Sequence, residues 1–287
     1  MTGAPDGKTS ELAEIQRVAV ELATLAGAEI QAALGSIMAV RYKGESPEKT
    51  LWRDPVSEID QRVETLIRAR VTERFPNHDV IGEEIAERVG QVHDYLWTID
   101  PIDGTTNFVN GFPMFAASIG VLQQGQPVVG AVWCSTGHAL RPGVYHARVG
   151  GKLRFEDGDV TPKLNPAVRR RLAGVPVLTA NDENWETRKT GSAAIECALV
   201  AAGMLRVARF DSPNIWDVAG GIVLVRAGGG TVRQLRGGQW ESLREFMPEQ
   251  PSIGGTADLR FWRHPLIVGA PEAVGRMCAE RQQTTSR

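Results

Sequence analysis

The sequence predicts an α/β protein in which helices cover parallel or mixed sheets. Its C-terminal half alternates between apolar strand segments and helical segments, in the order VPVLTA, GSAAIECALVAAG, MLRVARF, NIWDVAGGIVLVRAGG and TVRQL. Its N-terminal half opens with two amphipathic helices, which apolar strand segments follow. The 287 residues are enough for one large domain or two modest ones, and either can bury a hydrophobic core.

The N-terminal elements can be placed one by one. The first helix is expected after Ser10, its N-cap, with Gly35 as its stop, and the second covers SEIDQRVETLIRARVTERF. The polar stretch RYKGESPEKTLWRDP between them is typical of a loop. DVIGEE is a short apolar segment that ends in Gly82, Glu83 and Glu84, YLWTID is an expected strand, and FAASIGVLQQGQPVVGAVWCS predicts two strands joined by a turn. Residues 136–176 lack a clear period, and we place a soft boundary near 140–150, between parts 1–145 and 146–287.

Composition excludes several classes of function. The net charge of -2 argues against a general nucleic-acid-binding protein, which usually carries a basic excess. Three widely spaced cysteines indicate reduced thiols in a cytosolic protein. The N-terminus lacks the pattern of a signal peptide, and no apolar run is long enough to span a bilayer. We therefore expect a cytoplasmic protein without nucleic-acid or membrane partners.

Acidic residues recur at the edges of the expected elements. The positions are Asp54 before the second helix, Glu83 after VIG, Asp100 and Asp103 after WTI, and Asp217 in the first turn of a late helix. Two carboxylates about 5 Å apart repel by roughly 3 kcal/mol at an effective dielectric near 20. If they converge, such groups raise their own pKa values or recruit cations. A set of oxygen ligands without His or Cys suits Mg²⁺ or Mn²⁺ rather than zinc.

The stretch WTIDPIDGTTNF concentrates this chemistry. Pro101 is expected to lock a turn in which the two aspartates and the carbonyl of Ile102 face one cavity, while Gly104 exposes backbone N–H groups at a helix start. Cation ligands beside an anion cradle are what metal-assisted phosphate chemistry requires. On this stretch alone a plain turn remains an equal alternative, because Asp and Gly also serve backbone geometry.

Four segments together resemble the motifs of the inositol monophosphatase family, whose members are Mg²⁺-dependent, lithium-sensitive phosphatases. They are DPVSEID at 54–60, IGEE at 81–84, WTIDPIDGTTNF at 97–108 and NIWDVAGGIVLVRAGG at 214–229. Four motifs in order over most of the chain make the resemblance specific. It implies an alternating α-β-α-β-α sandwich, usually a homodimer, that holds two or three Mg²⁺ ions, with Mn²⁺ as a possible substitute.

The resemblance also implies roles for individual residues. One ion would be held by Glu83, Asp100 and the carbonyl of Ile102, and a second by Asp100, Asp103 and Asp217. Asp54 would hydrogen-bond Thr105, which would orient the attacking water, and Glu83 would help deprotonate that water. The N–H groups of Gly104 and Thr105 would hold the phosphate. The substrate-binding set would comprise Asp103, Gly104, Thr105, Gly191, Ser192, Ala193 and Asp217.

Simpler explanations exist for several of these residues. Asp54 could cap the second helix. Asp217 near a helix N-terminus is favourable to the helix dipole whether or not it binds metal. Asp60 matches a motif position but is interpreted as a structural partner on its helix, and Glu58 and Glu84 are expected to be solvated.

The substrate pocket departs from the family pattern. Inositol-cleaving members carry an acidic residue seven positions before the late metal aspartate, and this chain has Phe210 there, with Asp211 adjacent. Our main hypothesis is a Mg²⁺-dependent phosphomonoesterase acting on a small sugar or polyol phosphate. The alternatives are a phosphatase of histidinol phosphate, fructose 1,6-bisphosphate or a 3′-phosphorylated nucleotide, and a catalytically idle family member with a binding role.

Overall fold

The computed structural model describes most of the chain. The described residues are 7–35, 40–42, 55–86, 93–162, 165, 167–178, 184–248 and 258–285. Asp54, which the sequence analysis placed in the site, lies outside them. None of the helices in these ranges is long and apolar enough to cross a membrane.

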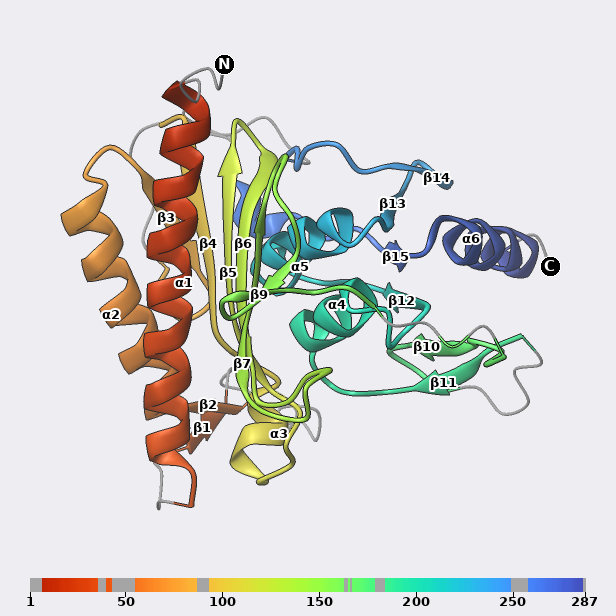
Figure 1. Ribbon diagram of the computed structural model, residues 1–287, viewed down its shortest axis with the longest axis horizontal. Helices are drawn as coiled ribbons and strands as arrows, with labels where there is room; N and C mark the ends of the chain where they lie inside the picture. The colour runs from red at the N-terminus through yellow and green to blue at the C-terminus, as the bar shows by residue number, and fades with distance from the viewer. Residues whose placement is uncertain are drawn as a thin grey trace.

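Five layers of helix and sheet stack across the molecule (Figure 1). The first layer contains α1 (Gly7–Ala33) and α2 (Glu58–Arg74), which cover a seven-stranded sheet. Helices α4 (Ala193–Ala201) and α5 (Ile215–Ala227) lie between that sheet and a six-stranded one, and α6 (Pro271–Thr285) covers the outer face of the second sheet. The predicted α-β-α-β-α sandwich is confirmed.

The seven-stranded sheet has its strands in sequence order. They are β3 (Asp79–Gly82), β4 (Tyr95–Asp103), β5 (Ala116–Gln123), β6 (Gln126–Cys134), β7 (Gly143–Arg148), β8 (Arg154–Phe155) and β9 (Gly158–Asp159). Strand β3 runs parallel to β4, and every later neighbour pairs antiparallel. Residue 145, where the sequence analysis divided the chain, falls inside β7, so this sheet continues past that point to Asp159.

The six-stranded sheet follows the order β11-β10-β12-β15-β13-β14. Its strands are β10 (Leu172–Gly174), β11 (Glu186–Arg188), β12 (Val207–Phe210), β13 (Thr231–Arg236), β14 (Gln239–Ser242) and β15 (Leu266–Gly269). The expectation of a strand in VPVLTA was wrong: residues 175–178 form no strand, and the pairing residues lie immediately before them. Three small elements complete the description: β1 (Val40–Tyr42) pairs with β2 (Pro55–Ser57), α3 is Thr105–Val109, and the 3₁₀ helix η2 is Leu259–Phe261.

The starts of the first two long helices differ in how well capping residues predict them. Helix α1 begins at Gly7, before Ser10, so the expected N-cap at Ser10 was wrong. Helix α2 has Ser57 as its N-cap, with Ser57 Oγ accepting from Ile59 N at 3.2 Å. Asp60 completes a capping box by accepting the backbone N–H of Ser57 at 2.8 Å.

Glycines allow α5 to lie directly on the first sheet. Gly120 on β5, Gly130 on β6 and Gly220 on α5 meet without side chains between them, because a Cβ on Gly130 would lie 2.2 Å from the carbonyl oxygen of Gly220. The apolar layer around this contact continues through α4 into the second sheet. The glycines therefore set the distance between α5 and the strands that carry the candidate site.

We expect Gly130→Ala to lower the free energy of unfolding by about 1 to 3 kcal/mol, because overpacking a tight backbone contact forces strands and helix apart. Urea denaturation would measure the change. Gly275→Ala is the matched control: Gly275 is an exposed position of α6 where a Cβ would meet nothing within 4 Å, so helix propensity alone predicts a gain of about 0.5 to 1 kcal/mol. Equal effects of the two substitutions would contradict this account.

Candidate active site

A β-bulge places the two aspartates of the central motif. Asp100 on β4 is opposite Ser118 on β5, whereas Asp103 is opposite Ala116, so β4 has one more residue than β5 between these pairs. In a regular strand, residues three apart point to opposite faces. The extra residue of a bulge re-aims a side chain. Asp103 lies close enough to Asp100 for its charge to raise the pKa of Asp100.

Glu83 reaches the same place from the neighbouring strand. Gly82, at the end of β3, is opposite Ile99 of β4 in parallel register, and the N–H of Glu83 donates to the carbonyl of Ile99 at 3.2 Å. The chain therefore leaves β3 beside the residue that precedes Asp100. The charge of Glu83 contributes to raising the pKa of Asp100.

Helix α5 brings the last aspartate. Its N-cap is Asn214, whose backbone N–H donates to Asp217 Oδ2 at 2.8 Å in a capping box. Ser118, the partner of Asp100 across the sheet, donates from Oγ to the carbonyl of Trp216 at 3.2 Å. This contact fixes the first turn of α5 next to Asp100. The structure thus places Glu83, Asp100, Asp103 and Asp217 close enough for their charges to interact, and their roles as metal ligands stay a prediction.

Burial and like charge dominate the electrostatics of this cluster. Asp100 is only 2% exposed, and burial, followed by the charges of Glu83, Asp103 and Asp217, holds its pKa well above the usual range. The pKa of Asp217 is raised well above its usual range by burial and by the charges of Asp103 and Glu83. Asp100 Oδ1 is buried and has no hydrogen-bond partner in the described part of the structure.

Asp103 is held from the opposite side by α4. Its Oδ2 accepts from Ser192 Oγ at 2.7 Å and from the N–H of Ala194 at 2.5 Å. Burial raises the pKa of Asp103 to about 6, although these two hydrogen bonds act to lower it. Ser192 also caps α4 by accepting from Ile195 N at 3.2 Å, so its hydroxyl is engaged on both sides.

Thr105 is held by Asp60; Asp54, the partner that the sequence analysis expected, lies outside the described residues, so its contact with Thr105 stays a prediction. Thr105 Oγ1 lies 3.2 Å from Asp60 Oδ1 and 2.8 Å from the carbonyl oxygen of Ile102. Asp60 is buried in the first turn of α2, and burial raises its pKa to about 6. The signal was present in the sequence, because Ser57 and Asp60 have capping-box spacing. That spacing fixes the helix start at Glu58 and turns the Asp60 carboxylate inward.

The predicted substrate-binding segment lies between Asp103 and α3. Gly191 has a φ of +81°, and a Cβ there would approach the Asn107 amide at 3.0 Å. Asn107 donates to the carbonyls of Met114 and Thr190, at 2.6 and 2.8 Å, and so ties the loop after α3 to the segment before α4. Substrate binding by Gly191, Ser192 and Ala193 stays a prediction.

Phe210 occupies a buried position at the end of β12. Its side chain is 7% exposed and belongs to the apolar layer formed with α4 and α5. Asp211 is 54% exposed and pairs with Arg209, with 3.2 Å between Arg209 Nε and Asp211 Oδ1. The neighbouring carboxylate is thus already paired with a cation.

The cluster is suited to cations by its donor chemistry. All its donors are oxygens, Asp100 Oδ1 is buried without a hydrogen-bond partner among the described residues, and the charges of Glu83 and Asp103 act to raise the pKa of both Asp100 and Asp217. Among the described residues, no three Asp, Glu, His or Cys side chains are yet arranged so that they could hold a metal ion. The donor set fits Mg²⁺ or Mn²⁺, provided that the carboxylates reorient around the ion.

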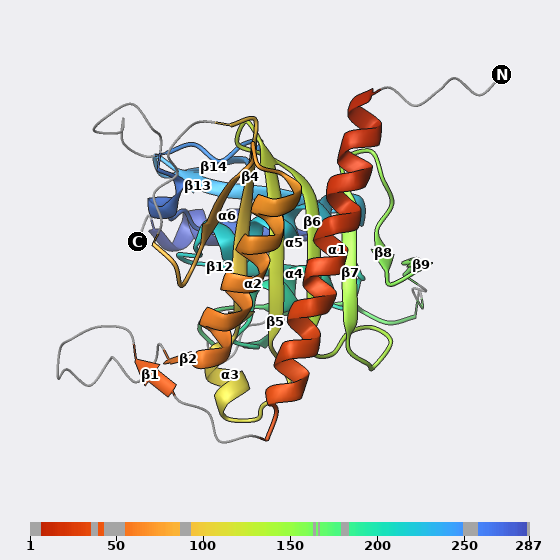
Figure 2. The ribbon, with the colours of Figure 1, turned by 90° about the vertical axis from the view of Figure 1, so that its left-hand side faces the viewer.

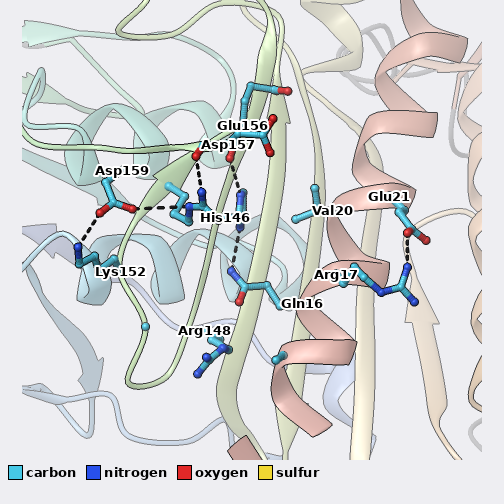
Figure 3. Close-up of a pocket in the computed structure, with 13 residues that line it drawn as sticks. Gln16, Arg17, Val20, Glu21, His146, Arg148, Lys152, Glu156, Asp157 and Asp159 are labelled. Carbon is cyan, nitrogen blue, oxygen red and sulfur yellow. Dashed lines mark hydrogen bonds and ion pairs between the residues drawn. The ribbon is translucent and has the colours of Figure 1, made fainter. Parts of the chain in front are cut away.

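A separate cavity of about 550 Å³ lies between α1 and strands β7 to β9, away from these residues (Figure 3). Its charged side chains largely pair with one another: Lys152 donates to Asp159 at 2.6 Å, and Arg17 pairs with Glu21. None of the predicted site residues lines it. Figure 2 shows α1 and α2 running across the face of the first sheet, with α3 at the lower end of its strands.

Comparison with known proteins bears on the function of this cluster. The model of the inositol monophosphatase family matches residues 11–272. The chain belongs to that family. Family members named inositol-1-monophosphatase are phosphoric monoester hydrolases, and this chain is an enzyme of that class. The family is generally metal-dependent.

Individual relatives carry several names. Phosphatase IMPL1 from the chloroplast of Arabidopsis thaliana is 31% identical over 239 residues, which cover 77% of this chain but only 62% of the plant protein. A fructose-1,6-bisphosphatase/inositol-1-monophosphatase of Aquifex aeolicus is 32% identical over 201 residues, 66% of this chain and 76% of the relative. An inositol-1-monophosphatase of Mesorhizobium japonicum is 30% identical over 234 residues, 77% of this chain and 86% of the relative.

A solved structure gives the same assignment of fold. The extragenic suppressor protein suhB from Bartonella henselae superposes with a TM-score of 0.72 and 25% identity, over 94% of this chain and 98% of that one.

We expect Asp100→Asn to stabilise the metal-free protein at pH 8 by about 1 to 3 kcal/mol, the scale of a close charge pair at an effective dielectric near 20. The folded state binds the Asp100 proton more tightly than the unfolded state, because the folded-state pKa is raised. The stability that protonated Asp100 contributes to the wild-type protein is therefore fully present below pH 3.8, and it is lost as the pH rises through the folded-state pKa. The gain from the neutral amide should shrink at pH 5.

Urea denaturation in EDTA at both pH values would measure this difference. Asp94→Asn, on an exposed residue before β4, should change stability by less than about 0.5 kcal/mol at either pH. A stability loss for Asp100→Asn at pH 8 would show that the cluster is not under repulsion.

Proposed function

We propose that this phosphatase hydrolyses the phosphate ester of a small sugar or polyol, with two or three Mg²⁺ ions, for which Mn²⁺ can substitute. The observation that carries the proposal is the buried Asp100, which has an oxygen without a hydrogen-bond partner among the described residues and whose pKa is raised by the charges of Glu83, Asp103 and Asp217. Such a set is unfavourable without a cation and favourable with one. The proposal agrees with the general metal dependence of the family.

Residues of this chain would hold the ions as follows. Glu83, Asp100 and the carbonyl of Ile102 would bind one ion, and Asp100, Asp103 and Asp217 a second. When bound, Mg²⁺ supplies neutralisation of phosphate oxygens and a lower pKa for water. Asp103 already accepts two hydrogen bonds through Oδ2, which leaves Oδ1 as its metal-binding oxygen.

Thr105 and Asp60 would orient the attacking water. When the Thr105 hydroxyl donates its proton to Asp60, the lone pairs on Oγ1 remain available to accept a hydrogen bond from water. Glu83 would take the proton that the water loses. The N–H groups of Gly104 and Thr105 would hold the phosphate, and Gly104 suits that position because its φ of +90° exposes the turn.

The leaving group would contact the segment Gly191, Ser192 and Ala193 beside Asp103 and Asp217. Because Phe210 stands where a carboxylate would accept hydrogen bonds from substrate hydroxyls, we propose a leaving group that needs fewer of them. A missing hydrogen-bond partner costs on the order of 1 to 3 kcal/mol in binding. The same residue favours, as second candidate, the phosphatase of another small phosphate, such as histidinol phosphate, fructose 1,6-bisphosphate or a 3′-phosphorylated nucleotide. The name of the Aquifex relative includes fructose-1,6-bisphosphatase.

Several expectations accompany this proposal. We propose a cytoplasmic homodimer that is sensitive to lithium and has a small phosphorylated metabolite, rather than nucleic acid or membrane, as its partner. Size-exclusion chromatography with light scattering tests the homodimer. A lithium titration of activity tests the sensitivity to lithium.

The experiment that tests the proposed function is phosphate release from a panel of small phosphomonoesters, with Mg²⁺ and with chelator. We expect Mg²⁺-dependent release from a sugar or polyol phosphate. Asp103→Asn should lose at least about 100-fold in rate and keep its fold by circular dichroism, because it removes a charge that would hold the metal. Release only from a nucleotide or amino-alcohol phosphate would favour the second candidate. A folded, Mg²⁺-binding protein with no activity on any ester would favour an idle, binding member of the family.

A second prediction separates Asp60 from Asp54. We expect Asp60→Asn to lower kcat by about 10- to 100-fold, since the hydroxyl of Thr105 would lose its charged acceptor. Asp54→Asn should have a smaller effect on kcat. Steady-state kinetics at saturating Mg²⁺ would measure both, and a larger loss for Asp54→Asn would support the role that the sequence analysis gave that residue.

A further inference from the structure

Helix α2 carries a buried polar face that extends beyond Asp60. Asp60, Glu64 and Arg68 follow one another at a spacing of four residues, so they lie on one side of the helix. All three are buried, and Glu64 is fully so. Long charged residues are almost never this buried unless they are paired. The face therefore has a specific set of partners.

Those partners are the backbone groups on both sides of Glu83. Glu64 accepts from Glu84 N at 2.7 Å, from Ile85 N at 3.2 Å and from Arg68 Nε at 2.7 Å. Arg68 donates to the carbonyl of Val80 at 3.3 Å and to the carbonyl of Ile85 at 2.9 Å. The pair thus contacts the chain before Glu83, on β3, and the chain after it.

Gly82 makes room for this contact. A Cβ on Gly82 would lie 2.3 Å from Glu64 Oε1, so only glycine lets the carboxylate approach the turn after β3 this closely. On its other side the same turn is tied to β4, through the hydrogen bond from Glu83 N to the carbonyl of Ile99. The backbone of Glu83 is consequently fixed between β4 on one side and the Glu64–Arg68 pair on the other.

We propose that Glu64 and Arg68 are positioning residues that hold the turn Gly82–Ile85 so that the Glu83 carboxylate is presented to the metal beside Asp100. The proposal rests on the proposed Mg²⁺-dependent function. Helix α2 then serves the site twice, because Asp60 on the same face holds Thr105. One rigid helix sets the position of a metal-binding carboxylate and of the hydroxyl that orients water.

The test measures Mg²⁺ binding to the metal-free full-length protein by isothermal titration calorimetry, together with kcat and the Mg²⁺ concentration for half-maximal activity. We expect Glu64→Gln to weaken Mg²⁺ binding by about 10- to 100-fold, the usual effect of removing a group that orients a metal ligand. Activity should need correspondingly more Mg²⁺, while kcat at saturating Mg²⁺ changes little. Glu73→Gln, on an exposed residue of the same helix, is the control and should change neither.

A second variant separates positioning from stability. Glu64→Gln removes the negative charge beside the buried Arg68, which can unfold the protein. The double variant Glu64→Leu with Arg68→Met removes both charges and keeps the volume, so it should fold and still bind Mg²⁺ about 10- to 100-fold more weakly.

The possible results have distinct meanings. Weak Mg²⁺ binding by a folded double variant supports the positioning role. Wild-type Mg²⁺ affinity in that variant overturns it and leaves the pair a purely structural contact. If the wild-type protein itself does not bind Mg²⁺, both this inference and the proposed function are overturned. The Glu73→Gln control would then also fail to bind Mg²⁺, which distinguishes this result from an effect of Glu64.

Discussion

Repulsion among buried carboxylates at the end of β4 is the constraint on which the site depends. Glu83, Asp103 and Asp217 each act to raise the pKa of Asp100. The fold holds them together through three separate devices: the bulge in β4, the parallel pairing of β3 with β4, and the glycine contact that seats α5 on the sheet. Because packing holds these like charges close together, a cation bound at that point would stabilise their charged forms.

Local chemistry explains how much the sequence could predict. Asp100 and Asp103 lie at the end of an apolar strand, Glu83 follows another strand, and Asp217 has Asn214 as the N-cap of its helix. Each of these features can be predicted from a window of about ten residues, because strand pattern and helix capping are local properties of the sequence. The layer order came from the resemblance of four motifs to one family, and the family match over residues 11–272 agrees with it.

Other features depended on contacts between distant segments. Asp60 lies in the first turn of α2, and its contact with Thr105, 45 residues further along the chain, is visible only in the structure. Glu64 and Arg68 look like an ordinary surface pair at i, i+4, because their partners lie about twenty residues further along the chain. The short strands between residues 143 and 174 have too few alternating positions to show a period.

Anomalous diffraction from crystals grown with Mn²⁺ tests the central claim most directly, because it locates the cation without reference to turnover. We expect an anomalous peak within coordination distance of Asp100 Oδ1, shared with Glu83 or with Asp217. Occupied Mn²⁺ sites elsewhere on the protein, with none beside Asp100, would contradict the account.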